Sequence, residues 1–164
     1  MLRLLHQSLS TAAPRATLLI RLMVGGIFLS EGFKKLLYPA DLAAGRFTRI
    51  GLPAPEFFGP FVATVEVGCG LLLLVGLLTR LATIPLLIAM VVAMISTKIP
   101  ILFGHKLWGF SLRPLTRYGW WPMLHESRND LSMILGSAFL LRVGAGPWSL
   151  DAKLGDRIRR DPRT

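Results

Sequence analysis

Two long apolar runs joined by a two-residue turn constrain this chain more than any other feature. The first covers about residues 57–78 and contains one charged side chain, Glu66, and the second covers about residues 81–99. A helix needs about 20 residues to cross the roughly 30 Å hydrocarbon core of a bilayer. Because only Thr79-Arg80 separates the runs, they predict two antiparallel, neighbouring membrane spans.

The composition is also typical of a membrane protein. Of the 164 residues, 52% are hydrophobic and only 17% are charged, whereas soluble domains carry about 25% charged residues. The formal net charge of +10 comes from basic residues in the segments that separate the apolar runs and in the residues after 151. The basic residues therefore form no single face of the kind that binds nucleic acid. The single cysteine, Cys69, excludes an intramolecular disulfide and a Cys-x-x-Cys site.

Two further stretches predict spans once polar residues are allowed within them. Residues 16–37 are too long for a signal-peptide core and predict a retained first span. The clean run 131–141 covers only about 16 Å as a helix, so a crossing helix would extend over about 124–143. The alternative is a short, partly inserted helix. The predicted fold class is all-α, a four-helix transmembrane bundle forming one domain over residues 1–164.

The segments between the predicted spans differ in character. After the first span, Asp41 is expected to cap a short helix that Gly51 ends. Between the third and fourth spans, aromatic residues alternate with Lys and Arg, which is typical of the headgroup level of a membrane. This segment therefore predicts an aromatic-rich interfacial or re-entrant loop. Residues 151–164 are polar and basic and predict a tail.

The orientation of the chain is nearly balanced by the positive-inside rule. With four spans both termini lie on one side, which carries ten of the Lys and Arg residues against nine on the other. The densest basic cluster lies after residue 151, which favours cytoplasmic termini in a bacterial inner membrane.

Charged side chains within the spans predict a polar layer in one half of the membrane. Such residues are costly in lipid and usually face the interior of a bundle. Lys34 and Lys35 follow Glu31 at i+3 and i+4, where either can pair with it. The candidate ligand-binding residues of this layer, together with the candidate catalytic residue Glu66, are Glu31, Lys34, Lys35, His125, Glu126, Asn129 and Asp130.

This polar layer has two interpretations. In the first, ion pairs and hydrogen bonds only fix which helices meet. In the second, the layer forms a pocket, open to lipid, for a hydrophobic molecule with a polar head such as a quinone. Glu66 has no basic residue within one turn of its own helix, so it either pairs across helices or stays protonated. Glu126 and Asp130 repel each other at i and i+4 unless a cation or a proton relieves them.

At the opposite ends of the spans, Arg21, Arg80 and Arg142 are expected to extend their charged tips to the membrane interface. The alternative is a binding site for lipid headgroups or a partner protein. No two histidines stand at i+3 or i+4, and no metal site is predicted. A site from His105, His125 and Glu126 would require the aromatic loop to fold back.

The order of several motifs resembles the DoxX family of small four-helix membrane proteins. The resemblance covers about residues 16–154. Arg21 is followed by Gly25-Gly26, and Glu66 by Gly70 and Gly76. The most specific part is Asn129-Asp130, then an apolar run, then Gly144-Ala145-Gly146-Pro147-Trp148-Ser149-Leu150-Asp151, which is similar to the family's closing Gly-x-Gly and Ser-Leu-Asp motif. The chain departs from the family in two features. Asp130 follows Asn129, where the family pattern predicts Asn followed by Glu, and the aromatic loop is long.

The resemblance implies a link to quinone-dependent oxidation of thiosulfate and to membrane oxidoreductase complexes. With the polar layer, it favours a quinone-binding or membrane-anchoring subunit of such a complex, with a protein partner or a second copy of the chain. Because the sequence has no dithiol, no paired haem histidines and no dinucleotide motif, we expect no covalently bound cofactor and no complete electron transfer by this chain alone. The alternative is a non-enzymatic membrane scaffold that recruits a soluble partner.

Overall fold

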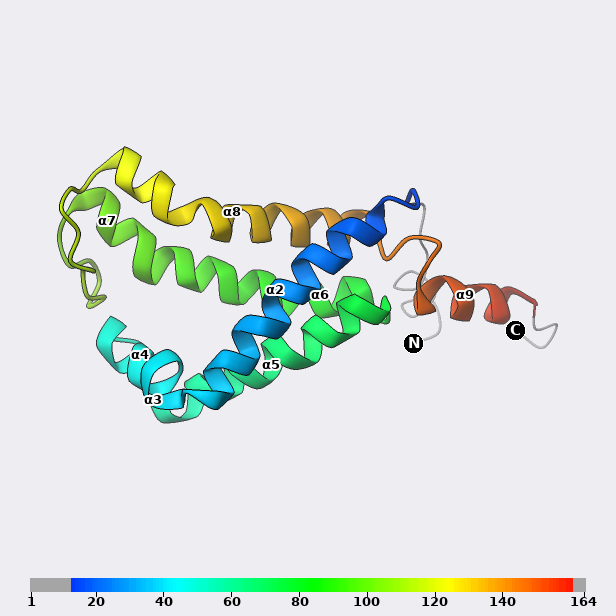
Figure 1. Ribbon diagram of the computed structural model, residues 1–164, viewed down its shortest axis with the longest axis horizontal. Coiled ribbons are helices and arrows are strands. Elements are labelled where there is room, and N and C mark those ends of the chain that lie inside the picture. Colours follow the sequence, from blue (N-terminus) through cyan, green and yellow to red (C-terminus); the bar gives the residue numbers. More distant parts are fainter. Residues whose placement is uncertain (1–12, 161–164) are drawn as a thin grey trace.

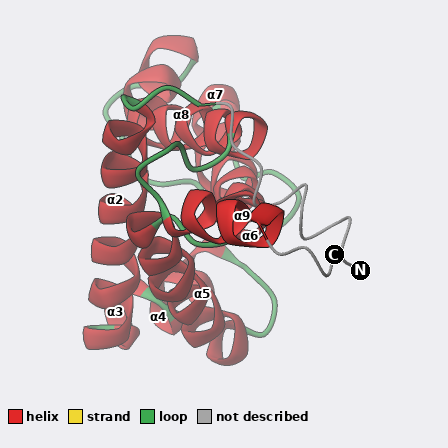
Figure 2. Ribbon diagram, turned by 90° about the vertical axis from the view of Figure 1, so that its right-hand side faces the viewer, coloured by secondary structure: helices red, strands yellow, loops and turns green. Residues whose placement is uncertain are grey.

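The computed structural model describes residues 13–160, and the regular elements in this range are helices, as predicted. Long helical stretches run alongside one another (Figure 1). They are α2 (Thr17–Leu37), α5 (Pro55–Val75), α6 (Thr79–Ala93) with its continuation η1 (Met94–Lys98) and α7 (Ile99–Phe103), and α8 (Trp120–Val143). Short α3 (Pro39–Leu42) and α4 (Ala44–Ile50) lie at one end, and α9 (Leu150–Arg160) lies at the other. Figure 2 shows only helices and loops among the described residues.

Two of these stretches are long and apolar enough to cross a membrane, Pro55–Val75 and Thr79–Phe103. Large apolar side chains lie exposed along both, including Phe61 on α5 and Ile88 on α6. An apolar surface of this kind fits contact with lipid chains. The other two long helices, α2 and α8, have 21 and 24 residues but contain more charged side chains.

The helix boundaries differ from the predicted ones at several places. The predicted Thr79-Arg80 turn is wrong, since these residues begin α6 and the turn is formed by residues 76–78. The third stretch continues past the predicted end at about residue 99 to Phe103. α5 ends at Val75 because Gly76 adopts a left-handed conformation with φ 69°. α8 begins at Trp120, earlier than predicted, and continues as one helix through the polar residues to Val143. The predicted capping role of Asp41 is wrong, since Asp41 lies inside α3, whose first residue follows Tyr38 without a side-chain cap.

A core of apolar side chains joins the long helices. Val24 and Phe28 of α2 pack with Leu73 of α5, Leu86 of α6 and Leu140 of α8, all buried. Burying a side chain of this size contributes roughly 1.5–3 kcal/mol in water, but in lipid the contribution comes from close packing instead. The helices must therefore fit one another closely.

Glycines bring α2 and α5 into backbone contact. A Cβ atom added at Gly32 would lie 2.8 Å from the Val67 nitrogen and 2.9 Å from the Ala63 oxygen, which is closer than real Cβ atoms approach. Small residues at helix interfaces allow this approach in membranes. Lys35 follows Gly32 by one turn, and Glu66 lies beside the contacted residues of α5. The glycine contact therefore brings Lys35 and Glu66 face to face.

Candidate functional site

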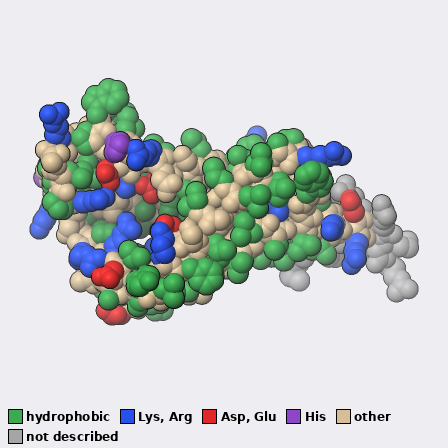
Figure 3. Space-filling model, viewed as in Figure 1, with side chains coloured by type: hydrophobic (Ala, Val, Ile, Leu, Met, Phe, Trp, Pro, Cys, Tyr) green, Lys and Arg blue, Asp and Glu red, His purple; other side chains and the backbone are tan. Residues whose placement is uncertain are grey.

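Charged side chains gather at the two ends of the molecule. Figure 3 shows Lys, Arg, Asp, Glu and His side chains around α3, α4, α7 and the start of α8, with mostly hydrophobic side chains along the middle of the same face. We call this region, including residues 104–119, the loop-side end. We call the start of α2, the α5–α6 turn and residues 144–160 the termini-side end.

A buried ion pair joins α2 to α5 at the loop-side end. The Lys35 Nζ atom lies 2.5 Å from both carboxylate oxygens of Glu66. The Lys35 and Glu66 side chains are 12% and 2% exposed, so Lys35 is the more accessible residue of the pair. Of the two states expected for Glu66, the structure has the pair across helices. Both contacts of the Lys35 ammonium are to this one carboxylate, and an ammonium has three N–H donors.

The second pair of the predicted layer lies on the surface. The Lys34 Nζ atom is 2.5 Å from Glu31 Oε1, at the expected i+3 spacing, and both side chains are largely exposed. Pairs of this kind contribute little to stability because water already solvates both charges.

Each of the two carboxylates of α8 forms an ion pair with a different basic residue from another part of the chain. Asp130 lies 3.2 Å from the Lys98 Nζ atom at the end of η1, and Glu126 lies 2.7 Å from Arg113 in the loop. The expected repulsion between Glu126 and Asp130 is therefore relieved by two separate cations and not by one shared between them. These pairs tie α8 to η1 and to the loop.

Other predicted residues of the layer are exposed. Asn129 is exposed on α8, and the ring nitrogens of His125 lie 3.2 and 3.3 Å from an Arg128 nitrogen. Within the described residues, no ion pair links the Lys35–Glu66 pair to the pairs of α8. The polar layer is thus a set of adjacent pairs at one end and not a single network.

The expectation that Arg21 extends to the membrane interface is wrong. Its side chain is buried, with the residue 2% exposed, and its guanidinium donates four hydrogen bonds to backbone oxygens. Leu73 and Leu74 accept two of them at 2.9 Å, in the last turn of α5, where helix carbonyls lack the usual backbone partner four residues later. Ala145 and Trp148 accept the other two, at 2.9 and 2.8 Å. Arg21 therefore fastens the segment after α8 to the end of α5.

The other two arginines of this end are placed differently. Arg142 is exposed, which agrees with an interfacial position, whereas Arg80 is half-buried at the start of α6. The buried Arg80 Nε atom has no hydrogen-bond partner among the described residues.

Asp151, which we expected in a polar tail, is buried and caps α6. Its carboxylate accepts hydrogen bonds from the backbone N–H groups of Leu78 at 2.7 Å and Thr79 at 3.0 Å. The Asp151 N–H donates to the Gly76 oxygen at 2.9 Å. Ser149 caps α9 by accepting from the Ala152 N–H at 3.1 Å. Residues 161–164 of the predicted tail lie outside the described residues.

We call the group formed by Arg21, Gly76, Ser149 and Asp151 the Arg21–Asp151 cluster. Its glycine is required, because a Cβ at position 76 would lie 2.6 Å from the Arg21 guanidinium carbon. The Ser-Leu-Asp motif contained a signal for this arrangement, since Ser is a preferred N-cap residue and an Asp at a helix start binds free N–H groups. The partner helix of that Asp was not readable from the sequence.

Two basic residues of functional interest were not among the predicted site residues. Arg46 and Arg49 stand at i and i+3 on α4 and line a cavity at the loop-side end. Among the described residues, no group of three or more His, Cys, Asp or Glu side chains is placed to hold a metal ion.

Comparison with known proteins places the chain in a family. The DoxX family model matches residues 16–99, which include α2 and α5 and reach the start of α7. An uncharacterized membrane protein of Mycobacterium tuberculosis, Rv3486, is 48% identical over 155 residues, covering 94% of this chain and 88% of the relative. No solved structure matches the chain. The family match and the extent of this identity show that the chain belongs to the DoxX family of membrane proteins.

Proposed function

We propose that this protein is a single membrane domain in which α2, α5, the α6–α7 stretch and α8 all cross a bacterial inner membrane. Their lengths of 21, 21, 25 and 24 residues correspond to about 32–38 Å of helix, which matches a hydrocarbon core of about 30 Å. The basic side chains of α9 favour termini on the cytoplasmic side. The loop-side end then lies at the outer headgroup level.

We further propose that the protein binds the head of a quinone beside the Lys35–Glu66 pair. The observation that carries this proposal is the ammonium of a mostly buried lysine, which has three N–H donors and binds a single carboxylate among the described residues. A quinone carbonyl oxygen is a suitable acceptor for it. Glu66 fixes the position of the ammonium and offers a second site for a proton. A bound quinone would supply the capacity to accept two electrons and two protons.

In this proposal the protein is the quinone-binding and anchoring subunit of an oxidoreductase complex, acting on a sulfur compound such as thiosulfate. A partner protein supplies the electron carrier, because the sequence has one cysteine and no paired haem histidines. The side chains of this chain bind and orient the quinone head and move protons at the Glu66 carboxylate and the Lys35 ammonium.

The proposal is tested by replacing the ion pair with two apolar residues of similar volume. Removing one partner alone leaves a buried charge and unfolds many proteins, whereas replacing both is often neutral or stabilising. We expect purified Lys35→Met/Glu66→Met to keep its thermal unfolding midpoint in lipid nanodiscs. We expect its affinity for decylubiquinone to fall by about tenfold or more, the effect of losing one charge-assisted hydrogen bond.

Glu31→Gln is the matched control, because it removes a carboxylate of the exposed neighbouring pair and should leave quinone affinity unchanged. Equal binding by the wild type and the double variant, or no binding by the wild type, would refute the quinone site.

A second function, recruitment of a soluble partner by a non-enzymatic scaffold, is favoured by α9. This helix is attached through the Arg21–Asp151 cluster and exposes Leu150 and Leu154 beside the exposed basic residues Lys153 and Arg157. A scaffold would keep its complex when the Lys35–Glu66 pair is replaced and lose it when Leu154→Asp alters α9. The same two variants therefore separate the two functions.

A further inference from the structure

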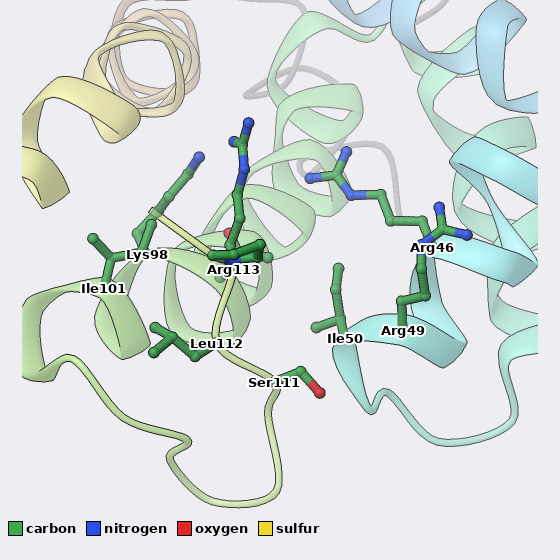
Figure 4. A pocket seen from close by; sticks show the side chains of 10 residues that line it. Arg46, Arg49, Ile50, Lys98, Ile101, Ser111, Leu112 and Arg113 are labelled. Carbon is green, nitrogen blue, oxygen red and sulfur yellow. The ribbon is translucent and has the colours of Figure 1, made fainter. Parts of the chain in front are cut away.

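A cavity of about 260 Å³ lies at the loop-side end, between α4, the η1–α7 segment and residues 111–114. Figure 4 shows Arg46 and Arg49 on the α4 side, with Lys98 and Arg113 across from them. The remaining lining is mostly apolar, including Ile101. Basic side chains from three segments far apart in the sequence therefore converge on one hollow.

The charges around this cavity do not balance. Lys98 and Arg113 are bound to Asp130 and Glu126, neither of which lines the cavity. Arg46 and Arg49 form no ion pair with any carboxylate among the described residues.

Neither arginine has a carboxylate of its own in the part of the chain that the structure describes. Arg46 acts on Glu66 only through space, and Glu66 is bound by Lys35. Arg49 donates to the backbone oxygen of Asp41 at 2.5 Å. Two positive charges thus remain uncompensated at the cavity, and they repel each other unless an anion lies between them.

The local backbone supports a binding role for the same residues. Met94–Lys98 forms a π-helical turn within an otherwise α-helical stretch, and it places Thr97 and Lys98 on the cavity wall. Such turns are rare and occur frequently at functional sites. On the other side, the Ser111 N–H donates to the Ile50 oxygen at 2.8 Å and fastens the loop to α4. This hydrogen bond holds the loop wall of the cavity to its α4 wall.

The position of the cavity indicates where its anion comes from. Exposed Trp108, Trp120 and Trp121 lie on the loop and the first turn of α8, at the same end. Tryptophan side chains exposed in this way are typical of the headgroup level, where lipid phosphates also lie. The volume is below the roughly 300–1,000 Å³ of pockets for drug-sized ligands, so a headgroup fits better than a whole lipid.

We propose that the cavity between α4, η1 and residues 111–114 binds the phosphate group of an anionic membrane lipid, with Arg46 and Arg49 as its principal ligands. Planar guanidinium groups bind phosphate oxygens through paired hydrogen bonds, which lysine does not reproduce. This site is distinct from the proposed quinone site, so each proposal stands without the other. Lipid binding here would fix α4 and the loop against the ends of the membrane helices.

The experiment is native mass spectrometry of the purified full chain in detergent, titrated with phosphatidic acid or with phosphatidylcholine. We expect tight binding of one phosphatidic acid by the wild type, and affinity weaker by about tenfold or more in Arg46→Gln/Arg49→Gln. Arg142→Gln/Arg157→Gln is the matched control, because it removes the same charge from exposed positions at the termini-side end. The control should bind as the wild type does.

A third variant and a competitor complete the test. Arg46→Lys/Arg49→Lys keeps the charge but loses the paired geometry, and we expect it to fall between the wild type and the glutamine variant. Displacement of phosphatidic acid by excess inorganic phosphate would assign the site to phosphate from either source. Resistance to displacement would assign it to the lipid. Equal weakening by the control pair, or wild-type affinity in Arg46→Gln/Arg49→Gln with an unchanged unfolding midpoint, would overturn the proposal.

Discussion

At the termini-side end, the buried guanidinium of Arg21 donates four hydrogen bonds to backbone oxygens, and Asp151 accepts two from backbone N–H groups. At the loop-side end, Lys35 is bound to one carboxylate, and Arg46 and Arg49 line a cavity without an ion-pair partner among the described residues. Both ends bring charge to the ends of apolar helices. A charged side chain whose hydrogen bonds are all made within the protein holds helices together. A charged side chain that lacks a partner of opposite charge, or has a hydrogen-bond donor to spare, is available to a ligand.

The largest effect is expected from Arg21→Leu. It removes the donor that Arg21 supplies to four backbone oxygens, of which, among the described residues, only that of Leu73 keeps a backbone N–H, and it removes the positive charge near buried Asp151, a loss of about 3–5 kcal/mol in the free energy of unfolding. We expect the variant to be largely unfolded in detergent, measured by size-exclusion chromatography and denaturant titration. Arg142→Leu removes an exposed arginine from the same end and should remain folded. A stable Arg21→Leu protein would show that the termini-side charges are not structural.

An intermediate effect is expected from Gly32→Ala. The added Cβ would meet the backbone of α5, and the resulting shift should cost about 1–3 kcal/mol of unfolding free energy. It should also separate Lys35 from Glu66 and weaken quinone binding. Gly26→Ala on the same helix meets nothing within 4 Å and should be neutral or slightly stabilising in a thermal melt. Similar melts for both variants would contradict the close contact of α2 with α5.

The smallest effect is expected from Glu31→Gln at the loop-side end. Its pair with Lys34 is exposed, and breaking such a pair changes the free energy of unfolding by about 0.2–1 kcal/mol. The loss should shrink further at high salt, because exposed charges are screened. A denaturant titration at low and high salt measures both. A large, salt-independent loss would place Glu31 among the structural charges.

The helices were more predictable than the contacts of their charged residues. Apolar length located the first three long helices, although the turn between the second and third lies at residues 76–78 and not at Thr79-Arg80, and the motifs correctly indicated the family. The start of α8 was missed because Trp120 and Trp121 read as interfacial loop residues, although they begin the helix. The burial of Arg21 was missed because an arginine near a helix end usually extends to the interface. Its acceptors lie at the end of α5 and in residues 145–148, and no local sequence pattern brings these two segments to Arg21.

The candidate site shows the same limit. The sequence indicated that Glu66 would either pair across helices or stay protonated. The structure has the pair, with Lys35 as the partner, because the glycine contact brings α2 close to α5. For Arg46 and Arg49, the sequence indicated only that two basic residues would be neighbours on one face of a short helix. Their importance depends on η1 and the loop lying opposite, which no local pattern specifies.

The hydrogen bonds of Arg21 also bear on how the protein is made. Two of its acceptors, the oxygens of Ala145 and Trp148, stand 124 and 127 residues later in the chain. The hydrogen bonds of Arg21 can therefore be completed only when residues 145–148 have been made. A chain interrupted before residue 145 lacks two of the four acceptors that hold this buried guanidinium.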